Sequence, residues 1–142
     1  MTTTTPAPTI AAPADTTRRS RSLPATTVLV GLGAALAVTA VAAAATAAGV
    51  PLEIDGEMIP IAGFAQMTFL GAVIGGVMVA VLNRRSAEPR HRFVQAAVAL
   101  TTLSCVPSVL LPPDAATKIA LVATHVVAAA IIVPVLARRA TA

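Results

Sequence analysis

The only ionisable side chain deep inside an apolar stretch of this chain is that of His125. It lies six residues after Ile119, where its stretch begins, which is about 9 Å along a helix. An ionisable residue inside a membrane is a candidate for function, because an imidazole there can relay a proton or help to bind a cation. The alternative is a neutral imidazole that hydrogen-bonds a neighbouring helix and only stabilises packing. Histidines that only stabilise packing are the commoner case, and we prefer this interpretation.

Three further polar or polarisable side chains are expected at a similar depth. Gln66 lies five residues after Ile61, where a second apolar stretch begins, and Ser104 and Cys105 lie in a third stretch. They predict a small polar pocket formed by Gln66, Ser104, Cys105 and His125. If the helices of Gln66 and His125 touch, these two side chains can hydrogen-bond each other.

Acidic residues gather in the two loops that lie at the same end of these stretches. They would form an acidic cap over the polar pocket, and such a site could bind a cation or pass protons. The simpler interpretation is interhelical hydrogen bonding, worth about 0.6 kcal/mol per contact. A cavity that reaches His125 would favour transport, and a sealed contact would favour packing. The cap residues are Glu53, Asp55, Glu57 and Asp114.

The sequence contains no HExxH, GxSxG, Walker or CxxC motif. The second histidine, His91, lies in a basic loop between Arg90 and Arg92, and the single cysteine cannot form an intrachain disulfide. We therefore expect no catalytic, cofactor-binding or metal-binding residues, and a protein that is not an enzyme.

Four apolar stretches must position these side chains, at about residues 26–50, 61–82, 93–111 and 119–136. Hydrophobic residues make up 56% of the chain and charged ones 11%, against about 25% charged in soluble domains. Each stretch is long enough to cross a hydrocarbon core of about 30 Å, where only helices satisfy the backbone. Short connections make consecutive helices antiparallel neighbours. We predict an all-α membrane protein, with a four-transmembrane-helix antiparallel bundle over residues 26–139.

The first 25 residues are rich in Thr, Pro and Ala and offer little apolar surface to bury. They predict a disordered cytoplasmic tail. A second interpretation makes the first stretch a cleaved export signal, with Arg18 and Arg19 as a twin-arginine pattern and a small-residue cleavage site at 45–47. The stretch is longer than a usual signal, so we expect it to be retained.

The distribution of charge predicts the orientation in the membrane. Short loops rich in Lys and Arg stay on the cytoplasmic side. This predicts a multi-pass protein of the inner (plasma) membrane with both termini in the cytoplasm. The cations have the bilayer as their expected partner, and no nucleic acid is expected. Nine of the ten cations fall in three clusters on that side: Arg18, Arg19, Arg21, Arg84, Arg85, Arg90, Arg92, Arg138 and Arg139.

The first outer loop has a pattern of its own. Apolar and acidic residues alternate over residues 52–55, and Asp55 is followed by Gly56, a strong signal for a two-residue hairpin turn. Pro51 and Pro60 bracket the segment and block continuation of the helices. We predict a small extracytoplasmic β-hairpin-like loop, with an irregular acidic loop as the alternative.

Gly71 and Gly75, followed by Gly76, form a small-xxx-small pattern that lets another helix approach closely. The pattern fits packing inside the bundle or a dimer seam, and we expect internal packing.

Beyond these local patterns, the chain resembles a known family. The four stretches, the acidic first outer loop and the closing run THVVAAAIIVP at 124–134 resemble small membrane proteins of high-GC actinobacteria, grouped as domain of unknown function 6069. The resemblance covers about residues 25–139. It implies a four-helix integral membrane protein without an assigned activity, and it brings no catalytic residues. Small multidrug transporters are also four-span proteins, but they depend on an acidic residue in the first span, which this chain lacks.

The leading hypothesis is therefore a small, non-enzymatic integral membrane protein that acts as an accessory or envelope component. Its expected partners are the lipid bilayer and either another membrane protein or a second copy of the chain. The alternative is a small transporter or channel with a polar layer around His125 and Gln66. A membrane enzyme comes third, because it would need an interfacial polar cluster that the sequence does not offer.

Overall fold

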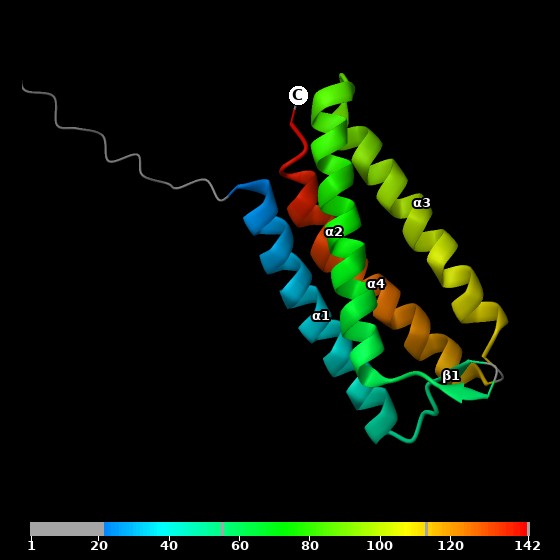
Figure 1. Ribbon diagram of the computed structural model, residues 1–142. Helices are drawn as coiled ribbons and strands as arrows, with labels where there is room; N and C mark the ends of the chain where they lie inside the picture. Colours follow the sequence, from blue (N-terminus) through cyan, green and yellow to red (C-terminus); the bar gives the residue numbers. More distant parts are fainter. Residues whose placement is uncertain (1–21, 55, 113, 142) are drawn as a thin grey trace, which may run out of the picture.

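The computed structural model is a bundle of four helices with a short β-hairpin at one end (Figure 1). It describes residues 22–54, 56–112 and 114–141. All four helices are long and apolar enough to cross a membrane, and the hairpin lies between the first two, so the predicted fold class is confirmed. The elements in chain order are α1 (Leu23–Ala47), β1 (Glu53–Ile54), β2 (Glu57–Met58), α2 (Ile61–Arg85), α3 (Pro89–Leu110) and α4 (Ala115–Ala137).

The beginning of α1 differs from the predicted boundary. The helix starts at Leu23, with a proline in its first turn, so residues 23–25 are helical rather than part of a tail. Proline is well tolerated there, because the first N–H groups of a helix have no partner within it. The rest of the predicted tail, residues 1–21, lies outside the described residues. At the other end of α1, Gly49 adopts a φ of 82°, the left-handed conformation that commonly ends a helix.

The helices also extend beyond the apolar stretches at the basic loop. Arg84 and Arg85 form the last turn of α2, and Pro89 opens α3. Arginines favour the C-terminal turn of a helix, where carbonyl groups carry partial negative charge. The connection between α2 and α3 is therefore very short and holds these two helix ends together.

The four helices do not pack equally. α1 packs along α2 and α4, and α4 also packs along α3, whereas α2 and α3 make fewer contacts with each other. Figure 1 shows α2 and α3 spreading apart from their short connection toward the hairpin end. One side of α2 is therefore left without a closely packed helix.

α1 and α2 are closely packed along their seam. A Cβ placed on Gly76 would lie 2.6 Å from Cγ2 of Thr27 and closer still to its Oγ1. A Cβ on Gly31 would lie 3.0 Å from both Ala72 and Phe69. Small residues on both helices let the backbones come this close, which is the usual basis of helix association in membranes.

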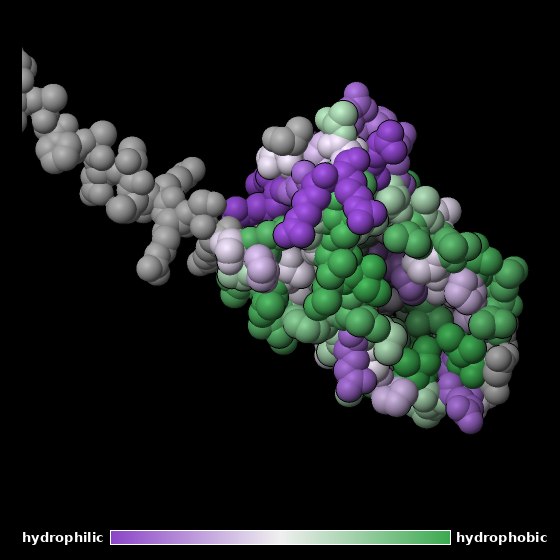
Figure 2. Space-filling model, turned by 45° about the horizontal axis from the view of Figure 1, so that its top comes forward, coloured by the Kyte–Doolittle hydropathy of each residue, from purple (hydrophilic) through white to green (hydrophobic). Residues whose placement is uncertain are grey.

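The end of the bundle opposite the hairpin, here called the arginine end, is held by Asn83. Its Nδ2 donates to the carbonyl of Arg139 at 2.9 Å, and its Oδ1 accepts from the N–H of Thr141 at 3.1 Å. Figure 2 shows hydrophilic residues gathered at this end, above a hydrophobic middle. The exposed arginines there are Arg84, Arg85, Arg90, Arg92 and Arg138.

The hairpin pairs Glu53 with Met58 and Ile54 with Glu57 in antiparallel register. Gly56 has a φ of 80°, as a tight hairpin turn requires. Next to the hairpin, Leu52 is buried in a core cluster with residues of α1, α2 and α4. The hairpin is thus anchored on the end of the bundle, and we call this end the hairpin end.

Candidate functional site

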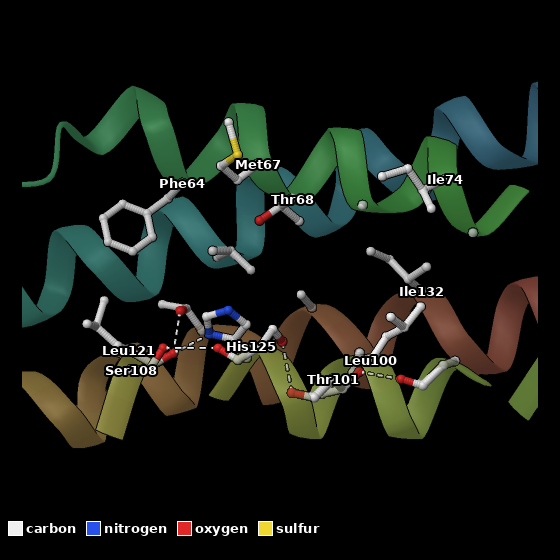
Figure 3. Close-up of a pocket in the computed structure, with 18 of the residues that line it drawn as sticks. Phe64, Met67, Thr68, Ile74, Leu100, Thr101, Ser108, Leu121, His125 and Ile132 are labelled. Atoms are coloured by element: carbon white, nitrogen blue, oxygen red, sulfur yellow. Dashed lines mark hydrogen bonds between the residues drawn. The ribbon is translucent and has the colours of Figure 1, made fainter. Parts of the chain in front are cut away.

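A cavity of about 660 Å³ lies between α2, α3 and α4 (Figure 3). Its volume falls within the range of small-molecule sites. On α2 its lining runs from Gly63 to Met78, and on α3 from Phe93 to Ser108. Each range covers fifteen residue steps, so the cavity extends about 22 Å along the helices. It is therefore a long, narrow space that follows most of the width of a membrane.

Apolar residues line both ends of the cavity. At the hairpin end, Ile54, Ile59 and Phe64 line it, so the hairpin turns its apolar side toward the cavity. At the arginine end the lining includes Phe93, which is only 1% exposed. α4 and Val38 of α1 complete the wall opposite the gap between α2 and α3.

The mouth of the cavity faces sideways, between α2 and α3. Met67 and Ile74 of α2 and Leu100 of α3 line the cavity and are also 66%, 53% and 51% exposed. Such residues lie at the rim, and on a spanning helix their exposed sides face lipid. Figure 2 shows the hollow as a recess near the centre of the molecule, surrounded mainly by hydrophobic residues. The cavity therefore opens toward the bilayer.

Among the described residues, His125 of α4 is the only titratable side chain in the lining. Its Nδ1 lies 2.8 Å from the carbonyl oxygen of Leu121. A carbonyl oxygen can only accept, so Nδ1 carries the proton and donates it, and in the neutral ring Nε2 is left as an acceptor. Among the described residues Nε2 has no protein partner, and it is open to the cavity.

Thr68 of α2 faces the same space from the other side. Figure 3 shows its side chain and the His125 ring pointing toward the gap between their helices. Within the described parts of the chain, the Thr68 hydroxyl makes no hydrogen bond to protein. Its oxygen is not fully buried. It can therefore both donate to and accept from a bound molecule.

The remaining hydroxyls of the cavity direct their protons to carbonyls of their own helices. This is the usual behaviour of Ser and Thr inside helices. Each oxygen keeps lone pairs that can accept from a ligand, so the polar atoms of the cavity are mostly acceptors. The bonds run from Thr101 to Ala97 (2.8 Å), Ser104 to Thr101 (2.8 Å), Ser108 to Ser104 (3.5 Å) and Thr124 to Leu121 (2.7 Å).

The structure brings together only part of the predicted polar pocket. Ser104 and His125 line the cavity, but Gln66 and Cys105 do not. Gln66 is exposed and follows the cavity-lining Phe64 by two positions, about 200° around the helix. The structure shows no hydrogen bond between Gln66 and His125, because equal depth does not place two side chains on facing sides. Cys105 is half-buried on α3, outside the lining.

Four polar residues of the cavity were not singled out by the sequence: Thr68, Thr101, Ser108 and Thr124. A signal for those on α3 does exist. Residues 97, 101, 104 and 108 recur at spacings of three and four, which places them on one helix face. In a stretch this rich in small residues, that periodicity is easily overlooked.

The acidic cap does not reach the cavity. Glu57 is exposed and Glu53 is half-buried, Asp114 is the N-cap of α4, and Asp55 lies outside the described residues. None of the described acidic residues lines the cavity, and nowhere in those ranges do three His, Cys, Asp or Glu side chains gather as metal ligands. In and beside the hairpin, Ile54 and Ile59 line the cavity, and Glu53 and Glu57 do not. The described acidic residues therefore do not form a cation site above His125.

Asp114 has a structural role instead. Its Oδ1 accepts from the backbone N–H of Thr117 at 2.8 Å. Hydrogen bonding by the side chain and the backbone N–H of Thr117 lowers the pKa of Asp114 from its ordinary value. The Thr117 hydroxyl donates to the carbonyl oxygen of Pro51, which lies 2.5 Å away. Asp114 and Thr117 thus tie the start of α4 to the loop that leads into the hairpin.

A comparison with family models matches residues 18–142 to a family of unknown function, DUF6069. No curated protein and no solved structure matches the chain.

Proposed function

Since the chain belongs to DUF6069, a family of unknown function, we propose that it is a non-enzymatic membrane component that holds a slender apolar molecule in the cavity between α2, α3 and α4. The observation that carries this proposal is the cavity itself, with its apolar walls and its mouth on the lipid-facing side. A molecule dissolved in the bilayer can enter it without passing through water.

The dimensions of the cavity favour a slender occupant. A volume of about 660 Å³ spread over about 22 Å describes a long, narrow space, which an alkyl or isoprenoid chain fits.

The hydrogen bonds in the cavity support binding over catalysis. A hydroxyl nucleophile would have to donate its proton to a base such as Nε2 of His125. The hydroxyls of Ser104, Ser108 and Thr124 donate to helix carbonyls instead, and the Thr68 hydroxyl makes no hydrogen bond to His125. We therefore assign the protein an accessory role, in which it binds or presents a lipid-like molecule.

We further propose that the protein lies in the inner (plasma) membrane, with the arginine end in the cytoplasm and the hairpin end outside. In a Cys105→Ala background, a cysteine at exposed Glu57 should react with an impermeant thiol reagent in intact cells, and one at exposed Arg85 should react only after lysis. Glu57→Cys and Arg85→Cys serve as controls for each other. Labelling of Arg85→Cys in intact cells would reverse the proposed orientation.

The binding proposal is tested with a photoreactive hydrocarbon. The purified full-length protein is reconstituted in nanodiscs with hexadecane that bears a mid-chain diazirine, illuminated, and mapped by mass spectrometry. We expect saturable labelling of cavity residues such as Thr68 and Ile132, displaced by unlabelled hexadecane. Exposed residues of α1 such as Leu36 should be labelled in proportion to probe concentration. Labelling of the two surfaces in the same non-saturable way would refute a binding site.

A second candidate function is transport of the same molecule, and the position of His125 in an open cavity supports it. The cavity does not favour a cation path, because its hairpin end is lined by the apolar residues Ile54, Ile59 and Phe64. Transport would therefore mean movement of an apolar molecule between leaflets. Faster transfer of the diazirine probe between leaflets of proteoliposomes than of protein-free vesicles would distinguish this role from binding alone.

A further inference from the structure

We infer that the bound molecule carries a neutral head group that donates a hydrogen bond, as a long-chain alcohol does, and that this head lies between His125 and Thr68. The inference rests on the proposed function, because it assigns a head group to the molecule that the cavity holds. It follows from the hydrogen bond that Nδ1 of His125 makes to Leu121, the lack of Lys, Arg, Asp and Glu among the described residues that line the cavity, and the position of both side chains along the cavity.

The backbone of α4 determines which nitrogen of His125 is left as the acceptor. Leu121 offers one carbonyl oxygen to two side-chain donors, Nδ1 of His125 at 2.8 Å and the hydroxyl of Thr124 at 2.7 Å. This holds the imidazole in the tautomer with its proton on Nδ1, so that Nε2 presents a lone pair to the cavity. A ligand group that can donate is required there.

The charge of the lining excludes an ionic head. Among the described residues, no Lys, Arg, Asp or Glu lines the cavity. A carboxylate or a phosphate would bring only acceptors to Nε2 and would lose its hydration without a cation to replace it. An ammonium group would likewise find no acid. A hydroxyl can donate to Nε2 of His125 and accept from the hydroxyl of Thr68, and it remains neutral.

The position of the two side chains orients the molecule. From Thr68 the lining of α2 continues ten residues to Met78, and from His125 that of α4 continues eight residues to Val133. These distances are about 15 Å and 12 Å toward the arginine end. Toward the hairpin end only five residues of α2 remain in the lining, about 8 Å, from Thr68 to Gly63. The head therefore lies nearer the hairpin, and the tail extends toward Phe93.

The experiment compares three unlabelled competitors of one chain length against the hexadecane diazirine probe. They are hexadecan-1-ol, hexadecanoic acid and hexadecane, used at pH 8, where the acid is ionised. We expect hexadecan-1-ol to displace the probe at a concentration about tenfold lower than the other two. One neutral hydrogen bond on each side of the head gives a gain of this order.

Two variants connect this preference with its residues. Thr68→Val removes the hydroxyl at almost constant volume, and His125→Phe removes the acceptor while keeping an aromatic ring. Each should weaken competition by the alcohol about three- to tenfold and leave competition by hexadecane unchanged. Thr101→Val is the matched control, because the Thr101 hydroxyl proton already bonds Ala97.

The outcomes separate the two claims. If the probe labels the cavity saturably but the acid competes as well as the alcohol, or if Thr68→Val leaves the preference intact, the head-group inference is wrong and the chain-binding proposal stands. If no hydrocarbon labels the cavity saturably, the proposed function itself fails. Should His125→Phe fail to fold, Thr68→Val alone still decides the inference.

Discussion

Replacing Gly76 with valine is expected to destabilise the bundle by at least about 3 kcal/mol, the upper range for overpacking in a well-packed interior. The added Cβ would overlap the side chain of Thr27, at 2.6 Å from its Cγ2. Thr27 is β-branched, and its Oγ1 donates to the carbonyl of Leu23 at 2.9 Å, so it has little freedom to move aside. α1 and α2 would have to separate, and separation would remove the van der Waals packing that holds helices together in a membrane.

The measurement is a titration of the purified protein from a mild detergent into sodium dodecyl sulfate, followed by circular dichroism. Gly33→Val is the matched control, because Gly33 also lies inside a helix but is exposed, with nothing within 4 Å of an added Cβ. Both variants introduce the same β-branched residue into a helix. Equal midpoints for Gly76→Val and Gly33→Val would show that the seam between α1 and α2 is not closely packed.

The sequence predicts the elements of this fold well, because each depends on a local rule. Four apolar stretches of membrane length require helices, and the Asp55-Gly56 pair between acidic and apolar residues predicts a hairpin turn. The structure contains both, with Gly56 in the left-handed conformation. Helix ends were predicted less closely, because Pro24 and Pro89 were not used as signals of a first helical turn.

The candidate site could be predicted only in part, because depth in a membrane and direction around a helix are separate quantities. His125 and Gln66 were placed at equal depth from their distance to the helix ends. The depth of a residue does not determine which side of its helix it lies on. Gln66 is exposed and is not part of the cavity that His125 lines. In a helix that is apolar all round, no amphipathic pattern indicates which face lies inside.

The three glycines of α2 illustrate the same difficulty. Gly75 and Gly76 pack closely inside the bundle, against Leu136 of α4 and Thr27 of α1, as the small-xxx-small pattern predicts. Gly71 belongs to the same pattern and lines the cavity, as Gly75 does, yet an added Cβ at Gly71 would meet nothing within 4 Å. Sequence alone treats the three as equivalent, and only the arrangement of the neighbouring helices distinguishes a packing glycine from one that leaves a space.

That space at Gly71 allows the binding proposal to be tested without damage to the fold. Gly71→Leu should place a branched side chain in the narrow cavity and reduce saturable labelling by the hexadecane probe at least tenfold. Leucine is a much better helix former than glycine, which is about 0.8–1 kcal/mol less favourable than alanine, so the stability of the variant should be equal to that of the original protein or higher. Loss of binding would then result from a filled cavity and not from unfolding.

Gly33→Leu is the control for this experiment, since it adds the same side chain to an exposed position of α1. It should gain the same helical stability and leave labelling of the cavity unchanged. If Gly71→Leu folds well and the probe still labels Ile132 saturably, the molecule does not occupy the space between α2 and α4. If both leucine variants reduce labelling equally, the effect comes from a changed lipid-facing surface. Only a loss confined to Gly71→Leu supports a chain held in the cavity, because the two positions differ in what their side chains face and not in the residue introduced.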